Sequence, residues 1–185
     1  MDRMFKLSVA LFNEYHYLEF VNQQNNIINF FTLNKGNDTF LNFTEIIFKA
    51  QKGFNLKNIR SFDYLEGFMD IHVFSERFKN SLETILKDEI IFYPCKVLCE
   101  EEKITFYIAK FIKYMDIIDE EASEYSTFSD GVKKLEKPVF KGGIDFDYAV
   151  RDSKELIISV VSNKFVELSK KNNFKISFDE LKVSV

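Results

Sequence analysis

The chain has few of the residues that build most metal and nucleophilic sites. Its 185 residues include two cysteines, two histidines, six glycines and no tryptophan. No Cys-x-x-Cys or His-x-Glu pattern occurs, which disfavours a zinc site. Gly-x-Gly-x-x-Gly and Gly-Lys-Ser/Thr are also missing, so the usual phosphate-binding loops are excluded. His16 and His72 lie 56 positions apart in predicted strands, and neither accompanies a recognisable nucleophile.

The two cysteines and the short apolar runs indicate in which cellular compartment the protein resides. If Cys95 and Cys99 share one strand, their Cα atoms lie roughly 13 Å apart, too far for a disulfide. Two unpaired thiols are typical of a reducing compartment. The N-terminal residues show no secretory pattern, and runs such as Leu156–Ile158 are far too short to span a membrane. The sequence predicts a cytoplasmic protein with no membrane contact.

Apolar residues are plentiful. They make up 46% of the chain, with 29% charged residues and 22 phenylalanines. This composition is ordinary for a soluble globular protein, and it supplies a core without a metal, a cofactor or a disulfide. The length predicts a single domain over residues 1–185, with a strand-rich part at 1–70 and a second part at 71–185.

Charge is unevenly distributed along the chain. Residues 100–130 contain nine acidic side chains and three lysines, so the net charge of this window is −6. Since the net charge of the whole chain is −4, the remaining residues carry +2. Nucleic-acid binding needs a basic face, so this distribution disfavours it.

Alternation of apolar residues predicts a strand from Phe5 to Leu11 and a partner strand from Tyr15 to Phe20. We also expect a strand at Ile27–Leu33. Phe40–Ala50 fits either a helix or a strand, and Gln51–Leu65 is expected to be irregular.

A short motif occurs twice. Val73–Phe78 is followed by the apolar run Ile90–Phe92, and Val160–Phe165 is followed by Ile176–Phe178. In each copy an apolar strand leads into a serine and then into apolar residues at helical spacing. Each unit therefore predicts a strand, a helix and a second strand.

Ser75 and Ser162 occupy the N-cap positions of the two predicted helices, where a hydroxyl accepts from free backbone N–H groups. Arg77 and Lys164 fall in the first turns, where a cation is unfavourable to the helix dipole. We expect each to pair with a nearby carboxylate, although a coincidence of two surface residues fits as well. Pro94 marks its strand as an edge or a bulge.

Between the repeats, Ile104–Ile118 predicts one or two strands, with a helix as the alternative, and Asp119–Asp130 predicts a loop. The fold class is thus α+β. It is strand-rich, with a mostly antiparallel sheet and two Ser-capped helices from the repeated unit.

The acidic segment is the main candidate site. Its members are Asp116, Asp119, Glu120, Glu121 and Glu124. Such carboxylates can form a general acid–base pair or a site for a hard metal ion. An acidic run is more often a solvated face, and it can also be a docking patch that attracts a basic partner.

Three segments in order carry a family resemblance: Val73–Val97, then Met115–Asp119 with Ser123–Tyr125, then Val160–Phe165 with Ile176–Phe178. Together they resemble a bacterial family of immunity proteins encoded beside polymorphic toxins. The resemblance covers roughly residues 71–185. Lys175 stands where the family pattern leads us to expect a glycine.

The resemblance implies a non-enzymatic, cytoplasmic protein that binds and neutralises a cognate toxin. A toxin that acts on nucleic acid would be basic, and the acidic residues could then cover its substrate channel. The five acids are the first choice for the contact surface, and Arg77 and Lys164 are the second. Two alternatives stay open: a general interaction or structural domain, including one that self-associates, and a metal-dependent hydrolase using Asp116 and Asp119.

Overall fold

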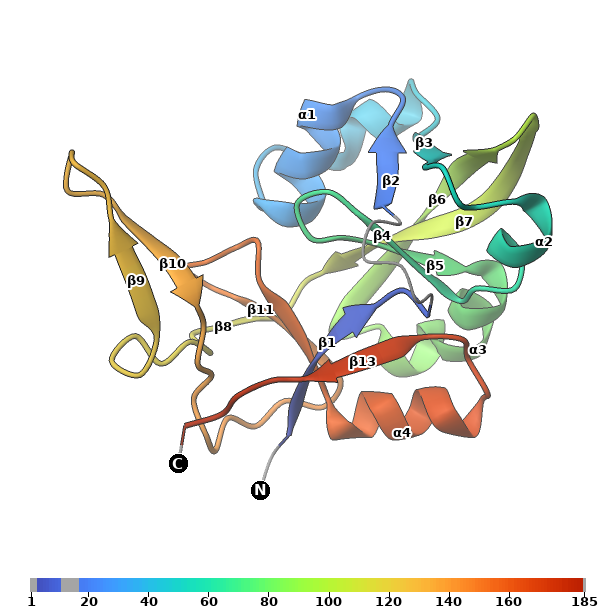
Figure 1. Cartoon of the computed structure of the whole chain (residues 1–185). Coiled ribbons are helices and arrows are strands. Elements are labelled where there is room, and N and C mark those ends of the chain that lie inside the picture. The colour runs from blue at the N-terminus through green and yellow to red at the C-terminus, as the bar shows by residue number, and fades with distance from the viewer. Residues whose placement is uncertain (1–2, 11–16, 185) are drawn as a thin grey trace.

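The structure is a computed structural model that describes residues 3–10 and 17–184. The described chain forms a closed barrel, a five-stranded sheet beside it, and a two-stranded hairpin that stands away from both (Figure 1). No helix of this part of the chain is both long and apolar enough to cross a membrane.

The barrel contains six strands in the order β2-β3-β6-β7-β5-β4. The strands are β2 (Tyr17–Phe20), β3 (Ile47–Ala50), β4 (Tyr64–Gly67), β5 (Ile71–Ser75), β6 (Ile90–Cys99) and β7 (Glu102–Phe111). The longest two, β6 and β7, pair antiparallel. Phe106 and Ile108 of β7 and Val97 of β6 belong to the barrel core.

The second sheet has the order β13-β1-β12-β11-β8, and the hairpin consists of β9 and β10. All neighbours in the sheet are antiparallel except β11 and β8. The strands are β1 (Met4–Ser8), β8 (Tyr114–Met115), β9 (Glu124–Thr127), β10 (Lys133–Lys137), β11 (Ala149–Asp152), β12 (Ser159–Ser162) and β13 (Ser177–Glu180).

Two helices lie together against the barrel and the sheet, α3 (Glu76–Leu86) and α4 (Asn163–Lys171) (Figure 1). Their buried phenylalanines meet, with 5.9 Å between the ring centroids of Phe78 and Phe165. Phe74 stacks on Phe78 at 4.3 Å, so these rings join the barrel to the helices. Many of the phenylalanines therefore pack in the core between the barrel and the two helices.

The two repeated segments have the same topology in different sheets. The strand before α3 and the strand after it, β5 and β6, both pair antiparallel with β7, which lies between them. Likewise β12 and β13, before and after α4, both pair antiparallel with β1. Ser75 Oγ accepts from the N–H of Phe78 at 3.1 Å, and Ser162 Oγ accepts from the N–H of Phe165 at 3.2 Å.

Several expectations for the first 70 residues are wrong. Ile27–Leu33 is not a strand but helical, formed by α1 (Gln24–Ile27) and a π-helical turn (Ile28–Thr32). Its buried residues Ile27, Phe30 and Phe31 have the spacing i, i+3 and i+4, which is helical rather than alternating. The strand at Tyr17–Phe20 pairs with β3 and β4, not with β1 (Met4–Ser8). The remaining ends of the two predicted strands, Leu11 and residues 15–16, lie outside the described residues.

Other segments are more regular than expected. The ambiguous stretch 40–50 is divided between a 3₁₀ helix (Asp38–Asn42) and β3. The stretch 51–65, expected to be irregular, contains α2 (Leu56–Ile59) and the start of β4. Asn55 and Asn58 cap the N-terminus of α2 with reciprocal hydrogen bonds. The predicted loop at 119–130 contains β9. The single predicted sheet is instead a closed barrel and a separate five-stranded sheet. Strands of both contribute to the core between them, among them Phe74 of β5 and Val161 of β12.

A buried polar network joins the barrel to the sheet. Arg151 of β11 is fully buried, and its Nη1 lies 2.8 Å from Oδ2 of Asp70, at the turn between β4 and β5. His72 of β5 contacts the hydroxyls of Ser159 in β12 (2.7 Å) and Tyr64 in β4 (2.9 Å). Burial alone would raise the pKa of Asp70, but His72 and Arg151 outweigh it and lower that pKa. The carboxylate is therefore held ionised between the two layers.

We expect Arg151→Met to reduce the free energy of unfolding by about 3–5 kcal/mol, because it leaves Asp70 as an unpaired buried charge. Chemical denaturation monitored by circular dichroism measures this. The control is Arg60→Met, which breaks the exposed pair of Arg60 with Glu102 and should cost at most about 1 kcal/mol. Equal losses in the two variants would contradict the joining role of Arg151.

Candidate functional site

The predicted acidic residues lie in one segment, but lysines from other segments neutralise part of it. Asp116 follows β8, and its two oxygens lie 2.8 Å from Lys141 Nζ and 3.1 Å from Lys154 Nζ. Lys154 also pairs with Glu120 at 2.5 Å. These contacts lower the pKa of Asp116, chiefly through its hydrogen bonds from Lys141 and Lys154. The surface therefore carries less net negative charge than the sequence suggests.

Three further members of the segment have different environments. Asp119 Oδ1 accepts from the N–H groups of Glu121 and Ala122, each at 3.1 Å, and so shapes the loop. Glu124, at the start of β9, pairs with Lys137 of β10 at 2.8 Å. Glu121 is exposed and makes no ion pair with any residue that the structure describes.

This arrangement does not resemble a hydrolytic metal centre. The oxygens of Asp116 are engaged by two lysines, and Asp119 is engaged by backbone N–H groups. Within residues 3–10 and 17–184, no group of three or more histidine, cysteine or acidic side chains is placed to hold a metal ion.

Arg77 and Lys164 both pair with carboxylates, as their positions in the two helices predict. Arg77 Nε lies 3.1 Å from Asp63 Oδ1, and Lys164 Nζ lies 2.8 Å from Asp147 Oδ1. The two pairs differ in burial, because the Asp63 side chain is only 3% exposed whereas both partners of the Lys164 pair are in solvent. Arg77 is thus part of the framework, and Lys164 remains a surface residue.

Asp63 connects both repeated units. In addition to Arg77, it accepts from Ser75 Oγ and from the N–H of Lys175, each at 2.7 Å. Burial would raise the pKa of Asp63, but hydrogen bonds from Arg77, Lys175 and Ser75 outweigh it and lower that pKa. Lys175, two residues before β13, is thereby held against the start of α3.

Two more buried carboxylates, Glu89 and Asp152, are not among the residues predicted from the sequence. Glu89 accepts from the N–H groups of Tyr148 and Ala149, both at 2.7 Å, and from Lys113 Nζ at 2.9 Å. Asp152 accepts from three backbone N–H groups, including that of Ile117 at 2.9 Å. The sequence feature that could have identified Glu89 and Asp152 is a single acidic residue inside or beside an apolar run. This feature differs from the clustered acids of residues 116–124.

His72 and Ser159 form the closest approach to a catalytic pair, and Ser159 and Asp70 line a pocket of about 260 Å³. Asp70 Oδ1 lies 3.2 Å from the same nitrogen, Nε2, that contacts Ser159. In a Ser-His-Asp triad the carboxylate contacts the ring nitrogen opposite the serine, whereas here Asp70 and Ser159 share Nε2 and Tyr64 occupies Nδ1. The group therefore acts as a structural network. His16 lies outside the described residues.

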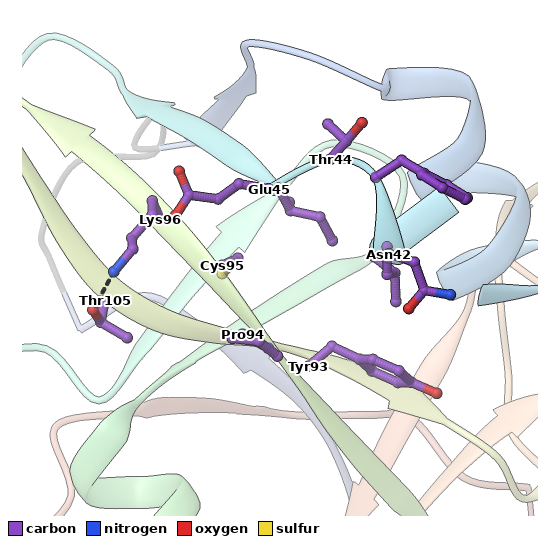
Figure 2. A pocket seen from close by; sticks show the side chains of 11 residues that line it. Asn42, Thr44, Glu45, Tyr93, Pro94, Cys95, Lys96 and Thr105 are labelled. Carbon is purple, nitrogen blue, oxygen red and sulfur yellow. Dashed lines mark hydrogen bonds between the residues drawn. The ribbon is translucent and has the colours of Figure 1, made fainter. Parts of the chain in front are cut away.

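A pocket of about 440 Å³ opens where β3 separates from β6 (Figure 2). Pairing of β3 with β6 begins at Lys96, so Pro94 has only β7 beside it, opposite Tyr107. Pro94 therefore lies at a local edge, as predicted, because the side of β6 that faces away from β7 has no paired strand at this position. Phe43, 86% exposed, lies at the rim, and Cys95 lines the pocket with a thiol whose pKa is raised by burial.

Comparison with known proteins gives one family. A family model described as immunity protein family (Imm11) matches residues 5–175. No curated protein matches the chain.

We expect Arg77→Ala to reduce the free energy of unfolding by about 1–3 kcal/mol, because Asp63 loses a charged hydrogen-bond donor. Lys164→Ala should leave stability within experimental error, because its pair is exposed. Urea denaturation of both variants measures the difference. A larger loss for Lys164→Ala would show that the two pairs have the opposite roles.

Acid should destabilise the protein through Asp63 and Asp70. Both folded-state pKa values lie below the unfolded value of about 3.9, so their stabilisation is complete above about pH 5 and is lost as pH falls through the folded values. Asp63→Asn should lower stability at pH 7 and flatten its dependence on pH in the acid range. Urea midpoints measured from pH 7 to pH 2 test this, and parallel curves for the variant and the native chain would contradict it.

Proposed function

Because the chain belongs to the immunity protein family Imm11, we propose that it binds and neutralises a cognate protein toxin, without an enzymatic step of its own. The match over residues 5–175 carries this proposal, since it extends across both the barrel and the sheet. The cytoplasm is the compartment we propose. Cys95 and Cys99 are both buried as free thiols, which suits a reducing environment.

The hairpin β9–β10 is the part of the fold that suits contact with another protein. It projects from the body of the molecule (Figure 1), and its two strands pair with each other and with no third strand of the described residues. Phe128 and Val132 face each other across its turn, with the Phe128 N–H donating to the Val132 carbonyl at 2.9 Å. They are 54% and 55% exposed. A partner that covers this pair would remove apolar surface from water at a protruding point.

The acidic residues lie at the base of the same hairpin. Glu124 belongs to β9, and Glu120 and Glu121 precede it in the connecting loop. Exposed carboxylates contribute little to affinity alone, but they speed the approach of a basic partner and orient it. We therefore keep the predicted surface, Asp116 to Glu124, and add the hairpin. Asp116 and Asp119 shape this surface. Glu121 presents a charge without an ion pair among the described residues, and Glu120 and Glu124 lie in exposed pairs with Lys154 and Lys137.

Co-expression with the product of the adjacent open reading frame tests the function. If that product is the toxin, it should arrest growth alone, and this chain should restore growth and co-purify with it. Rescue without a complex would favour an enzymatic mechanism instead, and failure of both would favour a general interaction domain.

Neutralising the exposed acids tests the surface. We expect Glu120→Gln/Glu121→Gln/Glu124→Gln to slow association with the toxin about tenfold at low salt and to weaken its salt dependence, while the melting temperature changes little. Stopped-flow or surface-plasmon measurements give the rates.

The matched control removes three exposed acids that lie elsewhere, Asp88→Asn/Glu100→Gln/Glu101→Gln. It changes the net charge equally, so a comparable loss of rate in the control would mean that total charge matters and that this surface does not.

A further inference from the structure

A pocket of about 320 Å³ lies between the acidic loop, the hairpin and the turn that follows β11. Its volume is at the lower limit of small-molecule sites, which suits one side chain better than a metabolite. It is lined by Ile118, Glu120, Glu121, Tyr125, Lys133, Asp152, Lys154 and Glu155.

The lining is richer in carboxylates than in cations, with four against two. Asp152 is already satisfied by backbone N–H groups, and Glu120 shares Lys154 with Asp116. Glu121 and Glu155 make no side-chain ion pair with the residues that the structure describes. These two carboxylates outnumber Lys133, the lysine of the lining that also makes no ion pair among the described residues, so this part of the pocket is net negative.

Tyr125 gives the pocket an aromatic wall. Glu120 and Glu155 line the same pocket as Tyr125. Desolvation raises the pKa of the Tyr125 hydroxyl, and these two carboxylates raise that pKa further. Ile118 is almost fully buried and adds apolar surface beside it. A flat cation bound between carboxylates and an aromatic face, with an aliphatic stem along apolar surface, is an arginine side chain.

We propose that this pocket receives an arginine side chain of the toxin. This rests on the proposed function, and it adds the chemistry of the contact: the guanidinium pairs with Glu121 and Glu155 and lies against Tyr125. Lysine fits less well, because its ammonium is a compact, strongly hydrated charge and cannot bridge two carboxylates as a planar fork does.

A peptide probe tests the pocket without the toxin. Acetyl-Gly-Arg-Gly-amide, titrated into the isotope-labelled full chain, should give saturable chemical-shift changes at Tyr125, Glu121 and Glu155. The same peptide with lysine should bind at least several-fold more weakly, and those with alanine or glutamate should leave these resonances unchanged. Equal responses to the arginine and alanine peptides, or no response at the pocket, would overturn the proposal.

Variants separate this inference from the proposed function. Glu121→Gln/Glu155→Gln should weaken arginine-peptide binding at least tenfold and should also weaken the toxin complex. Phe128→Ser, on the hairpin turn and outside the pocket lining, should weaken the toxin complex but leave peptide binding unchanged. If toxin rescue fails while the peptide binds selectively, the proposed function is wrong and the pocket stands. If rescue succeeds and Glu121→Gln/Glu155→Gln binds toxin normally, the pocket assignment is wrong.

Discussion

The ion pair between Asp70 and Arg151 is the contact on which the arrangement of the two layers depends. It joins a barrel turn to a strand of the neighbouring sheet, with His72 and Ser159 completing the network across the same boundary. Such a pair is costly to bury, so it gives little net stability compared with an apolar contact. Its geometry is demanding, however, and an alternative packing of the layers would leave a buried charge alone. Together with Asp63 and Glu89, it fixes segments that are far apart in the sequence.

The distinction between buried and exposed carboxylates bears directly on function. The acids that hold the fold are scattered along the sequence. Asp63, Glu89 and Asp152 each accept several hydrogen bonds, and Asp70 pairs with Arg151. The acids at the base of the hairpin have lysine partners or face solvent. A protein that acts through its surface needs both kinds, because a contact surface keeps its shape only if the framework beneath it is rigid. Arg77 contributes to the framework through its pair with Asp63, while its own side chain is 55% exposed.

How much could be predicted from the sequence depended on the range of the interactions. Local patterns worked well: alternation over residues 104–110 marks β7, and the serines before Phe78 and Phe165 mark the starts of α3 and α4. Closure of the barrel could not be predicted, because it requires parallel pairs between β2 and β4 and between β3 and β6, which no local pattern encodes. Ile27–Leu33 was misassigned because a short apolar run fits both periods. In the candidate site, the sequence identified the acidic segment, but not the lysines that neutralise it, since Lys141 and Lys154 come from distant loops.

The position of β1 has a consequence for biosynthesis. This strand is synthesised long before β12 and β13, which follow it by more than 150 residues and with which it pairs. During translation its apolar residues Phe5 and Leu7 therefore lack these partners until the intervening residues have left the ribosome. The sheet therefore cannot assemble progressively from the N-terminus, and a nascent chain interrupted before residue 160 would expose an unpaired strand that a chaperone would have to shield.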